Sequence, residues 1–97
     1  MTAPRAGPSR PLVVFELFLG LRSIGTVAWG TGGWIWVSIR DEAERAFLLE
    51  HLAGPHARGS SEEIRVRRED LSAQAFEEAC LALPALRGYE VAPRPVA

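Results

Sequence analysis

Hydrophobic and polar positions alternate along much of residues 12–40, which is typical of β-strands with two distinct faces. Residues 12–21 predict a first strand, because successive side chains of a strand point to opposite sides. One side would carry Val13, Phe15, Leu17 and Leu19, and the other Val14, Glu16 and Phe18. Residues 22–25 predict a turn, and residues 26–29 and 34–40 predict two more strands. The first part of the chain therefore predicts a three-stranded antiparallel meander.

The three tryptophans lie within eight residues, around the segment Gly-Thr-Gly-Gly at 30–33. Glycine adopts positive φ at little cost, so this segment predicts a hairpin loop. A phosphate-binding loop is disfavoured, because a strand follows rather than a helix N-terminus. A four-residue loop would pair Trp29 with Trp34. One face would then carry Val27, Trp29, Trp34 and Trp36, and the other Ala28, Ile35, Val37 and Ile39. An antiparallel sheet usually needs one apolar face, so we expect the tryptophan face to contact a partner.

The first helix is predicted to begin after Asp41, a good N-cap residue, with Glu44 at the spacing of a capping box. It runs to about Ala53 and ends at Gly54-Pro55, since glycine is preferred just past a helix end.

The second helix is predicted to begin after Ser72, with Leu71 packing on Phe76 as a hydrophobic staple. Its core stripe comprises Ala75, Phe76, Ala79, Cys80 and Leu83. Pro84 ends or kinks this helix because its ring nitrogen carries no hydrogen, and Gly88 stops it.

Between the helices, residues 62–68 alternate as a short strand with Ile64 and Val66 inward and a charged outer face, which suits a sheet edge. Residues 89–92 are a candidate for a short last strand. The predicted fold class is α+β, a two-layer sandwich in the order β-β-β-α-β-α with this optional strand. A single domain would span residues 12–92, between a flexible proline-rich tail at 1–11 and a C-terminal tail at 93–97.

Composition limits the function classes. Ninety-seven residues make one domain, and a net charge of −1 gives no global field for nucleic acid or an anionic membrane. All eleven basic residues are arginine, and lysine and asparagine are absent, which indicates a GC-rich genome of a bacterium or a bacterial virus. Glu16 and Arg22 interrupt the apolar stretch, so neither a membrane span nor a signal peptide is expected. One cysteine excludes an internal disulfide and suits a reducing compartment, so we expect a cytoplasmic protein.

No residue set predicts catalysis, a metal site, a cofactor or a small-molecule ligand. His51 and His56 are spaced wrongly for one helical face, and Cys80 lies on a core stripe. The carboxylates lie at caps and solvated positions, apart from Glu16, which interrupts an apolar strand.

These observations favour a non-catalytic protein-interaction module, such as an adaptor, an immunity or inhibitor protein, or a small regulatory subunit. The predicted partner-binding residues are Val27, Trp29, Trp34, Trp36 and Glu16. The partner would be another protein or a second copy in a homodimer. One alternative is a nucleic-acid-binding protein that uses the basic residues Arg65, Arg67 and Arg68 with aromatic stacking, although the flanking carboxylates disfavour it. Another is a small enzyme with an oligomeric active site.

Overall fold

A computed structural model describes residues 10–54 and 61–96. The predictions for most of the N-terminal tail, for His56 and for the last residue of the C-terminal tail lie outside the described residues.

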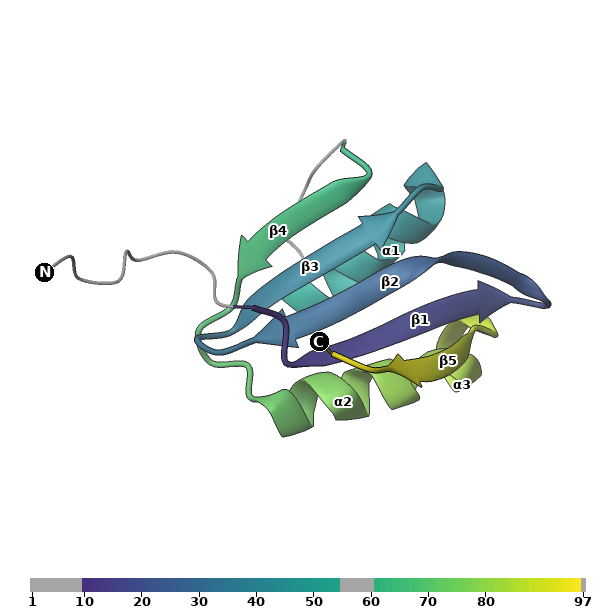
Figure 1. Cartoon of the computed structure of the whole chain (residues 1–97). Helices are drawn as coiled ribbons and strands as arrows, with labels where there is room; N and C mark the ends of the chain where they lie inside the picture. Colours follow the sequence, from purple (N-terminus) through teal and green to yellow (C-terminus); the bar gives the residue numbers. More distant parts are fainter. Residues whose placement is uncertain (1–9, 55–60, 97) are drawn as a thin grey trace, which may run out of the picture.

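Five strands form one antiparallel sheet with the order β4-β3-β2-β1-β5 (Figure 1). The strands are β1 (Val13–Leu19), β2 (Arg22–Gly30), β3 (Trp34–Ile39), β4 (Glu63–Arg67) and β5 (Glu90–Arg94). The helices are α1 (Glu42–Ala53), α2 (Ala73–Leu81) and the short α3 (Leu83–Arg87). The predicted α+β class is confirmed.

The hydrophobic core lies between the helices and one face of the sheet, which we call the helix face. The core contains alternate strand residues such as Val27 and Val37, together with Leu48 of α1 and Phe76 and Cys80 of α2. None of these side chains has exposed surface. In Figure 1, α1 lies behind β2 and β3, and no helix crosses the front of the sheet. We call this front the open face. Its residues are Val14, Glu16, Phe18, Ser23, Thr26, Ala28, Gly30, Trp34, Trp36, Ser38, Glu63, Arg65, Arg67, Glu90, Ala92 and Arg94.

The helix boundaries follow the predicted local signals. The Asp41 carboxylate accepts a hydrogen bond from the backbone N–H of Glu44 at 3.0 Å, and the Ser72 hydroxyl accepts one from that of Ala75 at 3.1 Å. Gly54 follows α1 with a φ of 109°, α2 ends at Leu81, and α3, which contains Pro84, ends before Gly88. The predicted boundaries are confirmed. Each of them depends on residues only a few positions apart, which is why the sequence could indicate it.

The predicted turn at residues 22–25 is wrong, because β2 already begins at Arg22. The chain turns instead at Gly20 and Leu21, and glycine with a φ of 64° at the first loop position suits a tight hairpin. The register shifts beside Leu17, so Ile24 is an extra residue in β2, a β-bulge. A Cβ on Gly25 would lie 2.0 Å from the Ser38 carbonyl oxygen, so only glycine fits there.

The predicted hairpin loop is present, but the predicted pairing across it is wrong. Gly30 belongs to β2 and pairs with Trp34, so the loop has three residues and Trp29 lies opposite Ile35. A shift of one residue moves a strand's side chains to the other face. The predicted face of Val27, Trp29, Trp34 and Trp36 is therefore divided, with the first two on the helix face and the last two on the open face.

The last strand extends to Arg94, two residues beyond the predicted end of the domain. Its neighbour is β1, with Phe15 opposite Pro93 and Val14 opposite Arg94. The beginning of the predicted C-terminal tail therefore forms part of the sheet.

Candidate functional site: the open face of the sheet

Trp34 and Trp36 lie on the open face of β3, the strand next to the β4 edge, and both are half-buried. Their neighbours on β2 are small, since Trp36 lies opposite Ala28 and Trp34 opposite Gly30. A Cβ on Gly30 would lie 2.9 Å from the outer ring atoms of Trp36. The indole of Trp36 therefore lies over Gly30, and a side chain at this position of β2 would displace the ring.

Two arginines of β4 border the tryptophans. Arg65 lies opposite Trp36 in the register and Arg67 opposite Trp34. Their guanidinium carbons are 5.8 Å and 5.6 Å from the centre of the Trp34 ring, within cation–π range. Arg67 also donates a hydrogen bond from Nε to the Gly32 carbonyl at 3.1 Å, which fixes it to the hairpin loop. The structure thus brings the predicted aromatic site and part of the predicted basic site together.

Arg68 does not belong to this group. Its Nη1 donates a hydrogen bond to the Leu52 carbonyl near the end of α1 at 3.2 Å, and its Nε lies 3.4 Å from the Asp70 carboxylate. This side chain secures the last turn of α1, which is a structural role.

Glu16 lies on the open face, as the predicted alternation of β1 requires, and it is paired within the chain. It accepts a hydrogen bond from the Ser23 hydroxyl at 2.6 Å and forms an ion pair with Arg94 of β5. The Ser23 hydrogen bond, together with that of Arg94, holds the pKa of Glu16 below its usual range. The carboxylate therefore stays ionised, and it ties β5 to β1.

The charges of the open face are balanced. Three arginines (Arg65, Arg67 and Arg94) lie beside three glutamates (Glu16, Glu63 and Glu90). Glu63 accepts a hydrogen bond from the Ser38 hydroxyl at 3.2 Å. The open face therefore combines a pair of tryptophans near the β4 edge with side chains of mixed charge.

The other two residues of the predicted binding face, Val27 and Trp29, lie in or against the hydrophobic core. Val27 has no exposed surface, and the indole N–H of Trp29 donates a hydrogen bond to the Leu71 carbonyl at 2.9 Å. Trp29 thus holds the segment that leads into α2.

The side chains that could react or bind a metal, such as Cys80 and His51, are engaged in the packing and hydrogen bonding of the fold. Cys80 has no exposed surface, and burial raises the pKa of its thiol to about 12, which opposes nucleophilic chemistry. The His51 ring lies 3.0 Å from the Ala79 carbonyl, so Nε2 serves as a hydrogen-bond donor. Within residues 10–54 and 61–96, no three histidine, cysteine, aspartate or glutamate side chains come together as a metal site would require. In the same ranges, no helix has the length and apolarity needed to span a membrane.

A surface depression of about 680 Å³ lies at the far ends of β2 and β3 from the hairpin loop. Its wall carries both charges, Arg22 and Arg40 against Asp41, Glu62 and Glu63. Arg40 lies 3.8 Å from Glu62, and both side chains are largely exposed. Positive and negative side chains are therefore mixed in the wall of the depression, so its charge does not favour either an anionic or a cationic ligand.

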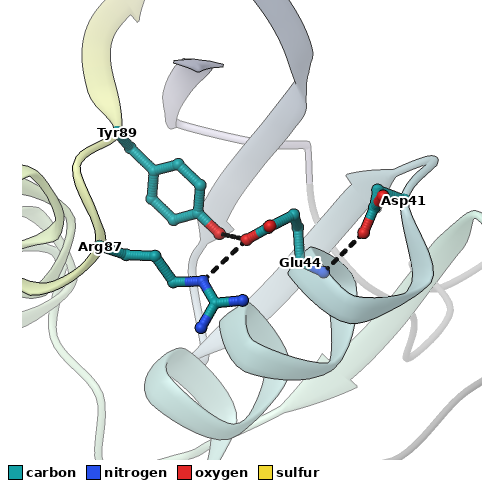
Figure 2. Close-up of polar contacts among 4 residues, drawn as sticks. All are labelled: Asp41, Glu44, Arg87 and Tyr89. Carbon is teal, nitrogen blue, oxygen red and sulfur yellow. Dashed lines mark hydrogen bonds and ion pairs between the residues drawn. The ribbon is translucent and has the colours of Figure 1, made fainter. Parts of the chain in front are cut away.

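One polar cluster was missed by the sequence analysis (Figure 2). The Glu44 carboxylate, expected to complete a capping box, accepts hydrogen bonds from Arg87 Nε at 2.9 Å and from the Tyr89 hydroxyl. The Arg87 hydrogen bond lowers the pKa of Glu44, and burial raises that of Tyr89. The guanidinium of Arg87 also lies 4.6 Å from the Phe47 ring centre. Because the partners are 43 and 45 residues from Glu44, no local pattern could indicate the cluster. It joins α1 to the end of α3 and to the segment between α3 and β5.

No protein-family model matches the chain, and comparisons with curated proteins and with solved structures found no significant match.

Proposed function

We propose that this chain is a non-catalytic protein-interaction module that binds a protein partner through the open face of its sheet. The observation that carries the proposal is the pair of half-buried indoles, Trp34 and Trp36, on a face that none of the described helices covers. Tryptophan is enriched among the residues that dominate binding energy, and accessible aromatic surface usually marks an interaction site. Adaptor, immunity or inhibitor protein, and small regulatory subunit are the roles that suit such a surface.

The border of the face indicates the chemistry of the partner. Apolar side chains of the partner would cover the two indoles, and an acidic group would suit the space beside Arg65 and Arg67. Glu16 and Arg94 already neutralise each other, so this end of the face favours a partner with little net charge. The single buried cysteine fits the proposed cytoplasmic location.

Single-stranded nucleic acid is the second candidate, because Arg65 and Arg67 flank the Trp34 ring. Bases stack on aromatic rings, and arginines contact the phosphates. The three glutamates on the same face oppose this reading, since they cancel the field that phosphates require.

The first experiment compares the double variant Trp34→Ala/Trp36→Ala with the control Leu81→Ala. Leu81 is an apolar residue of α2 that is 64% exposed and does not belong to the sheet. A partner is isolated by affinity capture, purified and titrated against each chain, with circular dichroism to verify folding. Hot-spot residues contribute about 2 kcal/mol or more, so the double variant should lose at least about 30-fold in affinity. Equal affinities for the folded double variant and the wild type would refute binding through the open face.

The second experiment replaces Arg65 and Arg67 by glutamine and uses Arg22→Gln as the control, because Arg22 is exposed at the other end of the sheet. The protein partner and a labelled single-stranded oligonucleotide are each titrated at two salt concentrations. For a protein partner, the change should appear mainly in the association rate. Tight oligonucleotide binding that falls steeply with salt and requires both arginines would favour the nucleic-acid reading.

A further inference from the structure

The sheet has two edge strands, and they differ in their capacity to accept another strand. β5 contains Pro93, which has no backbone N–H to donate, and proline protects a sheet edge from further pairing. β4 contains no proline, and in the part of the chain that the structure describes no strand pairs with its outer side. β4 is therefore the edge that is open to pairing.

The hydrogen bonds at the two ends of β4 show which of its backbone groups face outward. The Ile39 N–H donates to the Glu62 carbonyl at 2.9 Å, and the Arg68 N–H donates to the Gly33 carbonyl at 2.8 Å. Antiparallel strands alternate between residues that face the neighbouring strand and residues that face away from it. Even-numbered residues of β4 thus bond to β3, and Glu63, Arg65 and Arg67 direct their N–H and C=O groups outward.

We propose that β4 pairs antiparallel with β4 of a second copy of this chain, about a two-fold axis at Arg65, to form a continuous ten-stranded sheet. This contact is separate from the partner site on the open face, and either could exist without the other.

The sequence of β4, Glu-Ile-Arg-Val-Arg, is self-complementary in an antiparallel pairing. In this register the whole strand overlaps its copy, and Glu63 lies opposite Arg67 of the second copy at both ends. On the helix face, Ile64 lies opposite Val66 of the second copy, so apolar residues meet apolar residues. Opposite charges and apolar pairs directly across a ladder are stabilising.

Other registers match less well. A shift by two residues in one direction would place Arg65 opposite Arg67 of the second copy, and like charges would meet. The opposite shift would pair Glu63 with Arg65 but would bring Glu62 against Val66. In the proposed register the single unfavourable pair is Arg65 with its own copy. A contact of one short strand is also small, so the dimer should be concentration-dependent.

The two-fold axis would run perpendicular to the sheet, since residues directly opposite each other in an antiparallel ladder point to the same face. The open faces of both copies would then lie on the same side. Trp34 and Trp36 of each copy would belong to one broad surface, separated by the two central β4 strands.

The test uses the charge-reversal variants Glu63→Arg and Arg67→Glu, with each side chain exposed and each fold verified by circular dichroism and melting. Sedimentation velocity over a range of concentrations should show wild-type dimers. Each variant alone should be monomeric, because both ends of the ladder would then carry like charges. An equimolar mixture should restore the dimer, because the arginine introduced by the first substitution then meets the glutamate introduced by the second. A wild type that stays monomeric at the highest concentration, or a mixture that does not dimerise, would overturn the proposal.

Arg65→Thr tests the register itself. Threonine suits a strand and removes the like-charge pair at the axis, so this variant should dimerise at least several-fold more tightly than the wild type. Weaker dimerisation would overturn the register, since it would mean that Arg65 forms an attractive pair with Glu63.

If Trp34→Ala/Trp36→Ala abolishes the dimer while both charge-reversal variants retain it, the contact lies on the open face and β4 pairing is refuted.

Discussion

Replacing Phe76 by alanine should destabilise the protein more than any substitution on its surface. The Phe76 ring has no exposed surface and lies 6.2 Å from the ring of Phe15 on β1, so it connects α2 to the sheet. Removing a buried phenylalanine side chain costs about 3–5 kcal/mol, which includes the cavity that remains. Phe76 is also the fourth residue of α2 and belongs to the same core cluster as Leu71, the position at which a hydrophobic staple is expected. We therefore expect a loss of about 4 kcal/mol, a large share of the roughly 5–15 kcal/mol of a typical domain.

Urea unfolding measured by circular dichroism gives the free energy directly, and the slope against urea should stay unchanged if the native state is unaltered. The thermal midpoint should fall by roughly 15–30 °C for a domain of this size. The neighbouring Glu77 is exposed on the same helix, so Glu77→Ala is the control and should change stability by less than about 0.5 kcal/mol. A loss below about 1 kcal/mol for Phe76→Ala would show that α2 does not pack on the sheet through this ring.

Three further substitutions probe individual contacts. Ser72→Ala should cost about 1 kcal/mol in urea unfolding, because it removes the hydroxyl that caps α2; no change would mean that the cap contributes nothing. Gly30→Ala should destabilise by roughly 1–3 kcal/mol and alter tryptophan fluorescence, because the added Cβ would displace the Trp36 ring; an unchanged spectrum would contradict that ring position. Glu44→Gln should cost about 1 kcal/mol at neutral pH. The folded pKa of Glu44 is lowered, so its contribution is present above about pH 4.5 and is lost as pH falls below that value. The difference from wild type should therefore shrink in acid, and a constant difference from about pH 7 to pH 3 would contradict this.

The sequence predicted those parts of the fold that depend on near neighbours. Asp41 and Ser72 cap their helices by bonds to backbone groups three residues on, and such signals are present in any short window. The alternation of Ile64 and Val66 likewise identified β4 and its buried side. These features needed no knowledge of what lies beside them.

The pairing across the tryptophan hairpin could not be predicted in the same way. A Cβ on Gly33 would lie 1.9 Å from the Arg68 carbonyl oxygen, so a segment distant in the sequence packs against this loop. The hairpin sequence by itself reveals neither this contact nor the three-residue loop that places Trp29 opposite Ile35. The sequence analysis considered aromatic stacking together with the arginines, but the sequence did not indicate which arginines lie beside which tryptophan. Only the pairing of β3 with β4 brings Trp34 beside Arg65 and Arg67.

The place of β5 beside β1 has a consequence for the order of folding. β5 follows every other element along the chain, yet its neighbour is the first strand, and the Glu16–Arg94 ion pair joins residues 78 positions apart. During synthesis, the outer side of β1 therefore stays without its neighbour until the remainder of the domain has been made. Contacts this distant in the sequence slow folding, and strand edges left unpaired favour aggregation. Pairing of β5 with β1 would end that exposure, and Pro93 would then limit further pairing at the new edge, so we expect this late step to protect the sheet from aggregation.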